Sequence, residues 1–332
     1  MTEKVLESDL KCIPIQKMVF EKTLGGVPVN SFEPRNTPGE HVREDGVIYV
    51  NDICYGKEYP NSHLDIFYPD REKGKKRPTM IYIHGGGMIF GDKVSGDPLA
   101  AGVGRDVDFC ADIAKSGYNV ISPNYALAPE YRFPVQLKQV DQILTYLTEH
   151  QEEYGLDMDH IFLGGGSAGA CLSEIYGAMV VNPEYAKKTG VTPSIRKEQL
   201  AGLLIDESGL SVRHYEENMN AMFGCWVGVD RPSEKKEIEL LIDPVNWIKD
   251  TYIPSFIISS NLEIWFKDSA DDLAEALEKN GTEYEYYFRG QELDQLEHGF
   301  MKRYKSNEYA KECFEHMLAF MERVMKEKQK ED

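Results

Sequence analysis

The feature that most constrains the fold is one serine set between an apolar stretch and a helix-forming run. Residues 161–170 read I-F-L-G-G-G-S-A-G-A, which predicts a short buried strand, a tight turn at Ser167 and a helix over 168–181. Gly165, Ser167 and Gly169 form the G-x-S-x-G pattern, in which a strained turn presents a nucleophilic serine at the N-terminus of a helix. The alternative is a glycine-rich loop that cradles phosphate, which is weaker because no G-K-[ST] follows.

A second glycine-rich motif follows the apolar residues 80–83 and reads His84-Gly85-Gly86-Gly87. Glycines after a strand leave backbone N–H groups open to a ligand oxygen, and in esterases this H-G-G-G motif forms half of an oxyanion hole. We expect Gly86 and Gly87 to donate together with the amide of Ala168, the residue after the serine. Each such donor contributes roughly 3 kcal/mol of transition-state stabilisation. His84 itself is expected to shape the loop rather than to act as the base.

The catalytic base is predicted late in the chain, because the hydrolase order is nucleophile, acid, base. His298 follows the last predicted strand, and Gly299 after it allows a turn. The remaining histidines fit less well, since they precede the serine or fall in helices, turns or an insertion: His41, His63, His150, His160, His214 and His316. We therefore predict His298 as the base.

The acid of a triad is expected after the predicted strand over 255–260. Glu263 lies a few residues beyond it, where a carboxylate can reach the second nitrogen of the histidine and fix its tautomer. Three rivals remain, although they open the next predicted helix and fit better as its caps: Asp268, Asp271 and Asp272.

Strands and helices alternate along most of the chain, which favours a mostly parallel sheet covered on both faces. Eight strands are predicted, over 47–50, 64–68, 80–83, 119–122, 161–163, 200–205, 255–260 and 284–288. The N-terminal region is expected to hold two short helices, over 5–10 and 16–23, because Pro14 interrupts them. Residues 206–249 are longer than an ordinary crossover, so they fold over the site as a lid, form their own aromatic core, or do both.

The overall composition excludes several classes of function. The 332 residues carry a formal net charge of −19, which argues against binding nucleic acid or an anionic membrane. No signal peptide and no apolar stretch of about 18 residues is apparent. The six cysteines lie far apart without a C-x-x-C pair, which suits reduced thiols in a cytoplasmic protein better than disulfides or a zinc site.

Taken together, the motifs resemble the hormone-sensitive-lipase-like esterase branch of the α/β-hydrolase superfamily. H-G-G-G, G-x-S-A-G and His298-Gly299-Phe300 occur in the family's order, and residues 125–134 resemble its Y-R-L-A-P-E…F-P segment. The resemblance covers roughly residues 45–325. Gly166 stands where the family usually has an aspartate before the serine, and Glu263 replaces the usual aspartate of the triad.

The resemblance implies an α/β-hydrolase fold with an eight-stranded sheet as one domain over 1–332, and a lid built from residues 1–45 and 207–248. It also implies hydrolysis of short-chain acyl esters through an acyl-enzyme, with small-molecule esters as partners and no metal or cofactor. Two alternatives stay open, a peptidase or amidase with the same triad and a hydrolase fold that only binds a ligand. The oligomeric state is not readable, and a homo-oligomer is compatible with the sequence.

Overall fold

The computed structural model describes residues 5–70, 72, 75–100, 105–249, 251–262, 264–290 and 295–331. In this part of the chain a nine-stranded sheet has the order β1-β2-β3-β5-β4-β6-β7-β8-β9. Strands β4 to β9 run parallel, whereas β1, β2 and β3 pair antiparallel. The strand bounds are β1 Gly39–Val42, β2 Ile48–Cys54, β3 His63–Tyr68, β4 Arg77–Ile83, β5 Asn119–Pro123, β6 Leu156–Gly166, β7 Leu200–Asp206, β8 Ser255–Ser259 and β9 Tyr284–Phe288.

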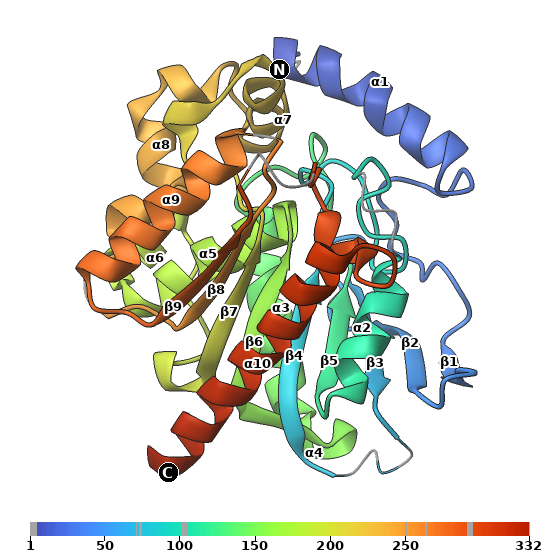
Figure 1. Ribbon diagram of the computed structural model, residues 1–332. Coiled ribbons are helices and arrows are strands. Elements are labelled where there is room, and N and C mark those ends of the chain that lie inside the picture. Colours follow the sequence, from blue (N-terminus) through green and yellow to red (C-terminus); the bar gives the residue numbers. More distant parts are fainter. Residues whose placement is uncertain are drawn as a thin grey trace.

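Helices cover both faces of this sheet (Figure 1). One hydrophobic core forms between the sheet and α2 and α10, and a second, larger core lies under α3, α5 and α9. Their bounds are α2 Asp106–Lys115, α3 Val135–Glu149, α5 Ala168–Val181, α9 Ile264–Lys279 and α10 Glu308–Glu331; the shorter helices are α4 Gln151–Tyr154 and α6 Pro183–Thr189. The prediction of a mostly parallel sheet covered on both faces is confirmed.

Two elements differ from the sequence prediction. The sheet has a ninth strand, β1, which was missed because its four residues contain no apolar run and three of them are exposed. The N-terminal region forms one helix, α1 Glu7–Lys22, which continues through Pro14. A proline inside a helix removes one backbone hydrogen bond. Burial of Cys12, Gln16, Val19 and Phe20 on one face of α1 offsets that loss.

The long insertion between β7 and β8 contains α7 Glu217–Val227 and α8 Lys236–Ile242. Helix α1 lies beside α7 at one end of the sheet (Figure 1), and the Cys12 thiol of α1 donates to the carbonyl of Ala221 in α7. Phe223 packs edge-on against the fully buried Trp226, whose indole donates to Gln136 of α3. These aromatic side chains therefore anchor the insertion to the rest of the molecule.

Within the described ranges, none of the helices combines the length and the apolar character that crossing a lipid bilayer would require.

Candidate active site

Ser167 occupies the turn between β6 and α5, as predicted. Its backbone has φ 52° and ψ −111°, a strained conformation for a residue with a side chain. Its amide donates to the carbonyl of Asp206 at 2.7 Å, which fixes the turn against the end of β7. A Cβ built on Gly165 or Gly169 would lie 2.1 or 1.9 Å from the carbonyl oxygen of Ile83. Both glycines are therefore required for the close approach of this turn to β4.

The loop after β4 contains Gly86 and Gly87, the predicted oxyanion donors, which have φ values of 104° and 60°. The carbonyl of Gly86 accepts hydrogen bonds from the amides of Ile89 and Phe90, both at 3.0 Å, so the loop is held by its own backbone. Ala168 is the first residue of α5, at the positive end of the helix dipole. The side chain of Gln16 in α1 donates to the carbonyls of Ile89 and Ala128 and ties α1 to this loop.

His84 supports this loop through its contacts with Tyr125. Its ring stacks on Tyr125 with centroids 4.3 Å apart, and the Tyr125 hydroxyl donates to the His84 carbonyl at 3.0 Å. Burial lowers the pKa of His84 to about 4, so the ring is neutral near pH 7. These contacts fit the predicted structural role.

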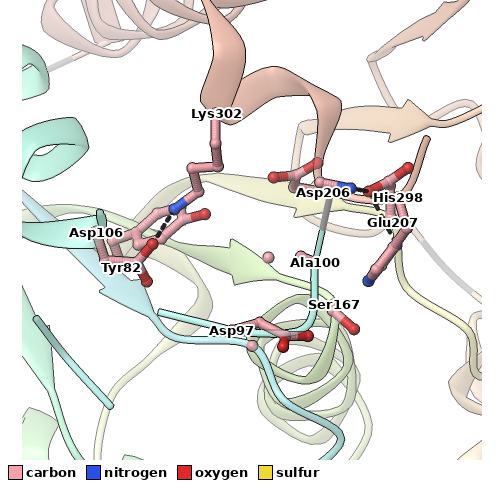
Figure 2. Close-up of a pocket in the computed structure, with 12 residues that line it drawn as sticks. Tyr82, Asp97, Ala100, Asp106, Ser167, Asp206, Glu207, His298 and Lys302 are labelled. Carbon is pink, nitrogen blue, oxygen red and sulfur yellow. Dashed lines mark hydrogen bonds and ion pairs between the residues drawn. The ribbon is translucent and has the colours of Figure 1, made fainter. Parts of the chain in front are cut away.

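His298 lies between β9 and the short helix Phe300–Arg303, and it lines the same pocket as Ser167 (Figure 2). The two residues are 131 positions apart in the chain, and their side chains are not hydrogen-bonded to each other in the described structure. Catalytic hydrogen bonds of hydrolases are often long or poorly aligned before substrate binds. The ring of Phe266 stacks on the imidazole with centroids 4.2 Å apart and an interplanar angle of 4°, which fixes the plane of the ring.

The carboxylate beside His298 belongs to Glu207, which sequence reasoning missed. Glu207 Oε2 lies 3.0 Å from His298 Nδ1, and the Glu207 side chain is only 1% exposed. Its two oxygens also accept from backbone amides, one from Ser260 at 2.8 Å and the other from Gly299. Glu263, the predicted acid, lies outside the described residues. The signal in the sequence that could have pointed to Glu207 is the Asp206-Glu207 pair at the C-terminal end of β7.

Acidic groups dominate the electrostatics of the pocket. Burial opposes protonation of His298, but attraction to Glu207, with smaller contributions from Asp97 and Asp206, raises its pKa to about 9. Burial also raises the pKa of Asp206, to about 7, and the neighbouring Glu207 adds to the shift. The His298 ring is therefore held as a cation paired with Glu207 at neutral pH.

The pocket has a volume of about 30 Å³, which is room for one or two water molecules. Lys302 and Asp106 also line it and form an ion pair with each other (Figure 2). Among the residues that the structure describes, no group of three or more His, Cys, Asp or Glu side chains is placed to hold a metal ion.

Similarity to known proteins identifies the family of the chain. Residues 64–268, more than half of the chain, match the BD-FAE family. The chain belongs to the BD-FAE family. This BD-FAE protein is 31% identical to lipase 2 of Moraxella sp. over 131 residues, which cover 39% of the chain and 26% of that relative. It is 38% identical to arylacetamide deacetylase of Bos taurus over 112 residues, which cover 32% of the chain and 26% of that relative. The match thus spans about a quarter of the length of each.

Among solved structures, esterase B from Lactobacillus rhamnosis aligns with a TM-score of 0.71 at 21% identity, over 88% of this chain and 90% of that one. This similarity shows the fold. The predicted α/β-hydrolase fold and the resemblance to hormone-sensitive-lipase-like esterases are confirmed by these comparisons.

Proposed function

We propose that this BD-FAE protein hydrolyses short-chain carboxylic esters through a covalent acyl-enzyme on Ser167. One observation carries the proposal: Ser167, strained at a helix N-terminus, and His298, far away in the chain, line one pocket. Strained serines of this kind recur at the nucleophile elbows of hydrolases. The relatives named lipase and deacetylase support acyl transfer, and the acetyl group in the second name supports a short acyl chain.

The proposed mechanism has two balanced halves. Ser167 Oγ attacks the ester carbonyl while His298 Nε2 takes the hydroxyl proton, and the amides of Gly86, Gly87 and Ala168 bind the oxyanion. The tetrahedral intermediate collapses as His298 gives that proton to the leaving alcohol. Water then attacks the acyl-enzyme with His298 as base, and collapse of the second intermediate returns the proton to Ser167 and releases the carboxylic acid.

We propose Glu207 as the carboxylate that orients His298 and stabilises its cation. Its contact with Nδ1 and its two backbone donors hold it in the place that a triad acid needs. Glu263 remains the rival predicted from the sequence, and substitution of each residue separates the two.

We also propose that α1 and α7 belong to a lid over this site, with segments 1–45 and 207–248 around a single hydrolase domain. Contacts of α1 with the loop after β4 and with α7 support this role, because they connect both segments to the proposed oxyanion amides.

The raised pKa of His298 predicts how the rate of hydrolysis depends on pH. A general base must be neutral, so kcat/KM for p-nitrophenyl acetate should rise with pH and level off only above about pH 9. The pKa of His298 is raised in the free enzyme. The fraction of enzyme with a neutral His298 therefore falls about tenfold for each pH unit below that pKa. Initial rates between pH 6 and 10, corrected for spontaneous hydrolysis, measure the midpoint. A midpoint near 6.5 would show that no carboxylate is coupled to the catalytic base.

The test of the function itself combines labelling with turnover. A fluorophosphonate probe should modify Ser167, located by peptide mass spectrometry, and p-nitrophenyl acetate should be hydrolysed with burst kinetics if deacylation is slow. A protein that binds the ester without turnover and resists the probe would be a ligand-binding hydrolase fold.

An amidase with the same residues is the second candidate, because one relative is named arylacetamide deacetylase. Matched p-nitrophenyl acetate and p-nitroacetanilide separate the two activities, since both release a chromophore after transfer of the same acetyl group. We expect the ester to be preferred by at least a hundredfold in kcat/KM. A ratio near one would assign the protein to the amidases.

A further inference from the structure

Two methionines of α7 pack against the loops that carry the proposed catalytic groups. Met222 packs against Gly87, where a Cβ would lie only 2.1 Å from the methionine sulfur. Met219, one turn earlier, packs against Gly209, where a Cβ would lie 2.9 Å from the methionine methyl group. Gly87 belongs to the proposed oxyanion loop, and Gly209 comes two residues after Glu207. One face of α7 therefore contacts both the loop after β4 and the segment after β7.

Phe266 completes this apolar cover on the side of His298. Its ring stacks on the imidazole and would lie 3.3 Å from a Cβ at Gly209. Met219 and Phe266 are each 5% exposed, whereas Met222 is only half-buried. We call Met219, Met222 and Phe266 the apolar roof. Within it, Met222 has the most freedom to move, because methionine has three rotatable side-chain bonds and its neighbours do not enclose it.

The stereochemistry of acyl transfer decides which part of the substrate meets Met222. The carbonyl oxygen must face the amides of Gly86 and Gly87, and the leaving oxygen must face His298, which protonates it. The alcohol therefore leaves on the side of His298 and Phe266. The fourth substituent of the tetrahedral carbon, the acyl chain, takes the remaining direction, away from His298. Met222 is the residue of the apolar roof that packs on the loop after β4 rather than beside His298.

We propose that Met222 is the residue that limits the length of the acyl chain. The proposal rests on the ester hydrolysis proposed above and names its substrate class, esters of small acyl groups such as acetyl. An acetyl methyl group fits beside the methionine, whereas each added methylene must displace it. Discrimination in apolar pockets reaches about 10-fold to 200-fold for one methylene, so a single side chain can set the preference.

The experiment compares wild type with Met222→Ala and Met222→Val on p-nitrophenyl acetate, butyrate, hexanoate and octanoate. Met325→Ala is the matched control, because Met325 lies on α10, which belongs neither to the proposed lid nor to the lining of the pocket. We expect the ratio of kcat/KM for hexanoate over acetate to rise at least tenfold in Met222→Ala and by less in Met222→Val. The control should keep the wild-type ratio. Thermal melting identifies any variant that has lost its fold. If Met222→Ala is unfolded, the comparison with wild type is made with Met222→Val.

A second series holds the acetyl group constant and lengthens the alcohol from ethyl to octyl. Met222→Ala should leave that profile unchanged within about twofold. An unchanged acyl profile in both variants, or an equal shift in the alcohol series, would overturn the assignment of Met222. Absence of turnover on every ester in wild type would instead overturn the proposed function.

Gly87→Ala provides an independent check of the contact. The new methyl group would meet the Met222 sulfur, and φ is 60° at this position, so we expect at least a hundredfold loss of kcat/KM on the acetate ester. Adding Met222→Ala removes the collision but not the backbone strain, so it should restore about a tenth or more of the lost rate. No recovery in the double variant would show that the loss comes from the backbone and not from a collision with Met222, which contradicts the proposal.

Discussion

Replacing Ser167 with alanine should reduce kcat on p-nitrophenyl acetate by about 10⁶-fold, to a rate that the remaining oxyanion amides alone can support. The reason is that Ser167, at the strained turn from β6 into α5, supplies the nucleophile of the proposed mechanism. The strain at φ 52° is the same for alanine as for serine, so the substitution removes the hydroxyl without adding a new cost to the turn. The measurement is steady-state hydrolysis of acetate esters, with the fluorophosphonate probe as a second readout.

Ser194→Ala is the matched control for this variant. Ser194 is exposed in a surface loop and lines no part of the pocket, so its substitution should leave kcat and probe labelling unchanged. A Ser167→Ala protein that keeps its fold and more than a tenth of the wild-type rate would show that another residue carries the acyl group.

The sheet was predictable because its central strands are apolar runs bounded by turn residues. β4, β5, β6 and β7 are buried along most of their length, and a strand covered on both faces leaves a continuous hydrophobic signal in the sequence. β1 leaves no such signal, because an exposed edge strand needs few apolar residues. α1 was predicted as two pieces because a local rule, the disfavour of proline inside helices, is outweighed by packing against α7 that only the tertiary structure shows.

The site was predictable where local backbone chemistry determines it. The turn at Ser167 requires glycines on both sides, and the backbone at position 87 has a positive φ that favours glycine. Both requirements are visible in the sequence as glycine residues. The carboxylate is different, because it depends on which strand ends beside His298. β7 and β8 are parallel neighbours, and the amide of Glu207 donates to the carbonyl of Ile258 at 3.1 Å. A carboxylate after either strand therefore reaches the same region, and chain order cannot choose between Glu207 and Glu263.

Substitution of the two glutamates should give opposite results. We expect Glu207→Gln to lower kcat on p-nitrophenyl acetate by about 10³-fold to 10⁴-fold, because an amide cannot stabilise the imidazolium and favours the wrong tautomer of His298. Glu263→Gln should change kcat by less than about tenfold. Steady-state rates of both variants are measured beside wild type, with thermal melting to confirm that each is folded.

The pH profile distinguishes an electrostatic role of Glu207 from a merely structural one. Attraction to Glu207 raises the pKa of His298, so its removal should move the midpoint of kcat/KM from about 9 down toward the ordinary histidine value of about 6.5. Loss of packing or of the bonds to Ser260 and Gly299 would lower the rate without moving that midpoint. Glu207→Asp keeps the charge and should retain a raised midpoint at reduced rate. If Glu263→Gln shows the large loss and the shifted midpoint instead, Glu263 is the carboxylate that acts on His298 during turnover, and the contact of Glu207 with Nδ1 belongs to the resting enzyme.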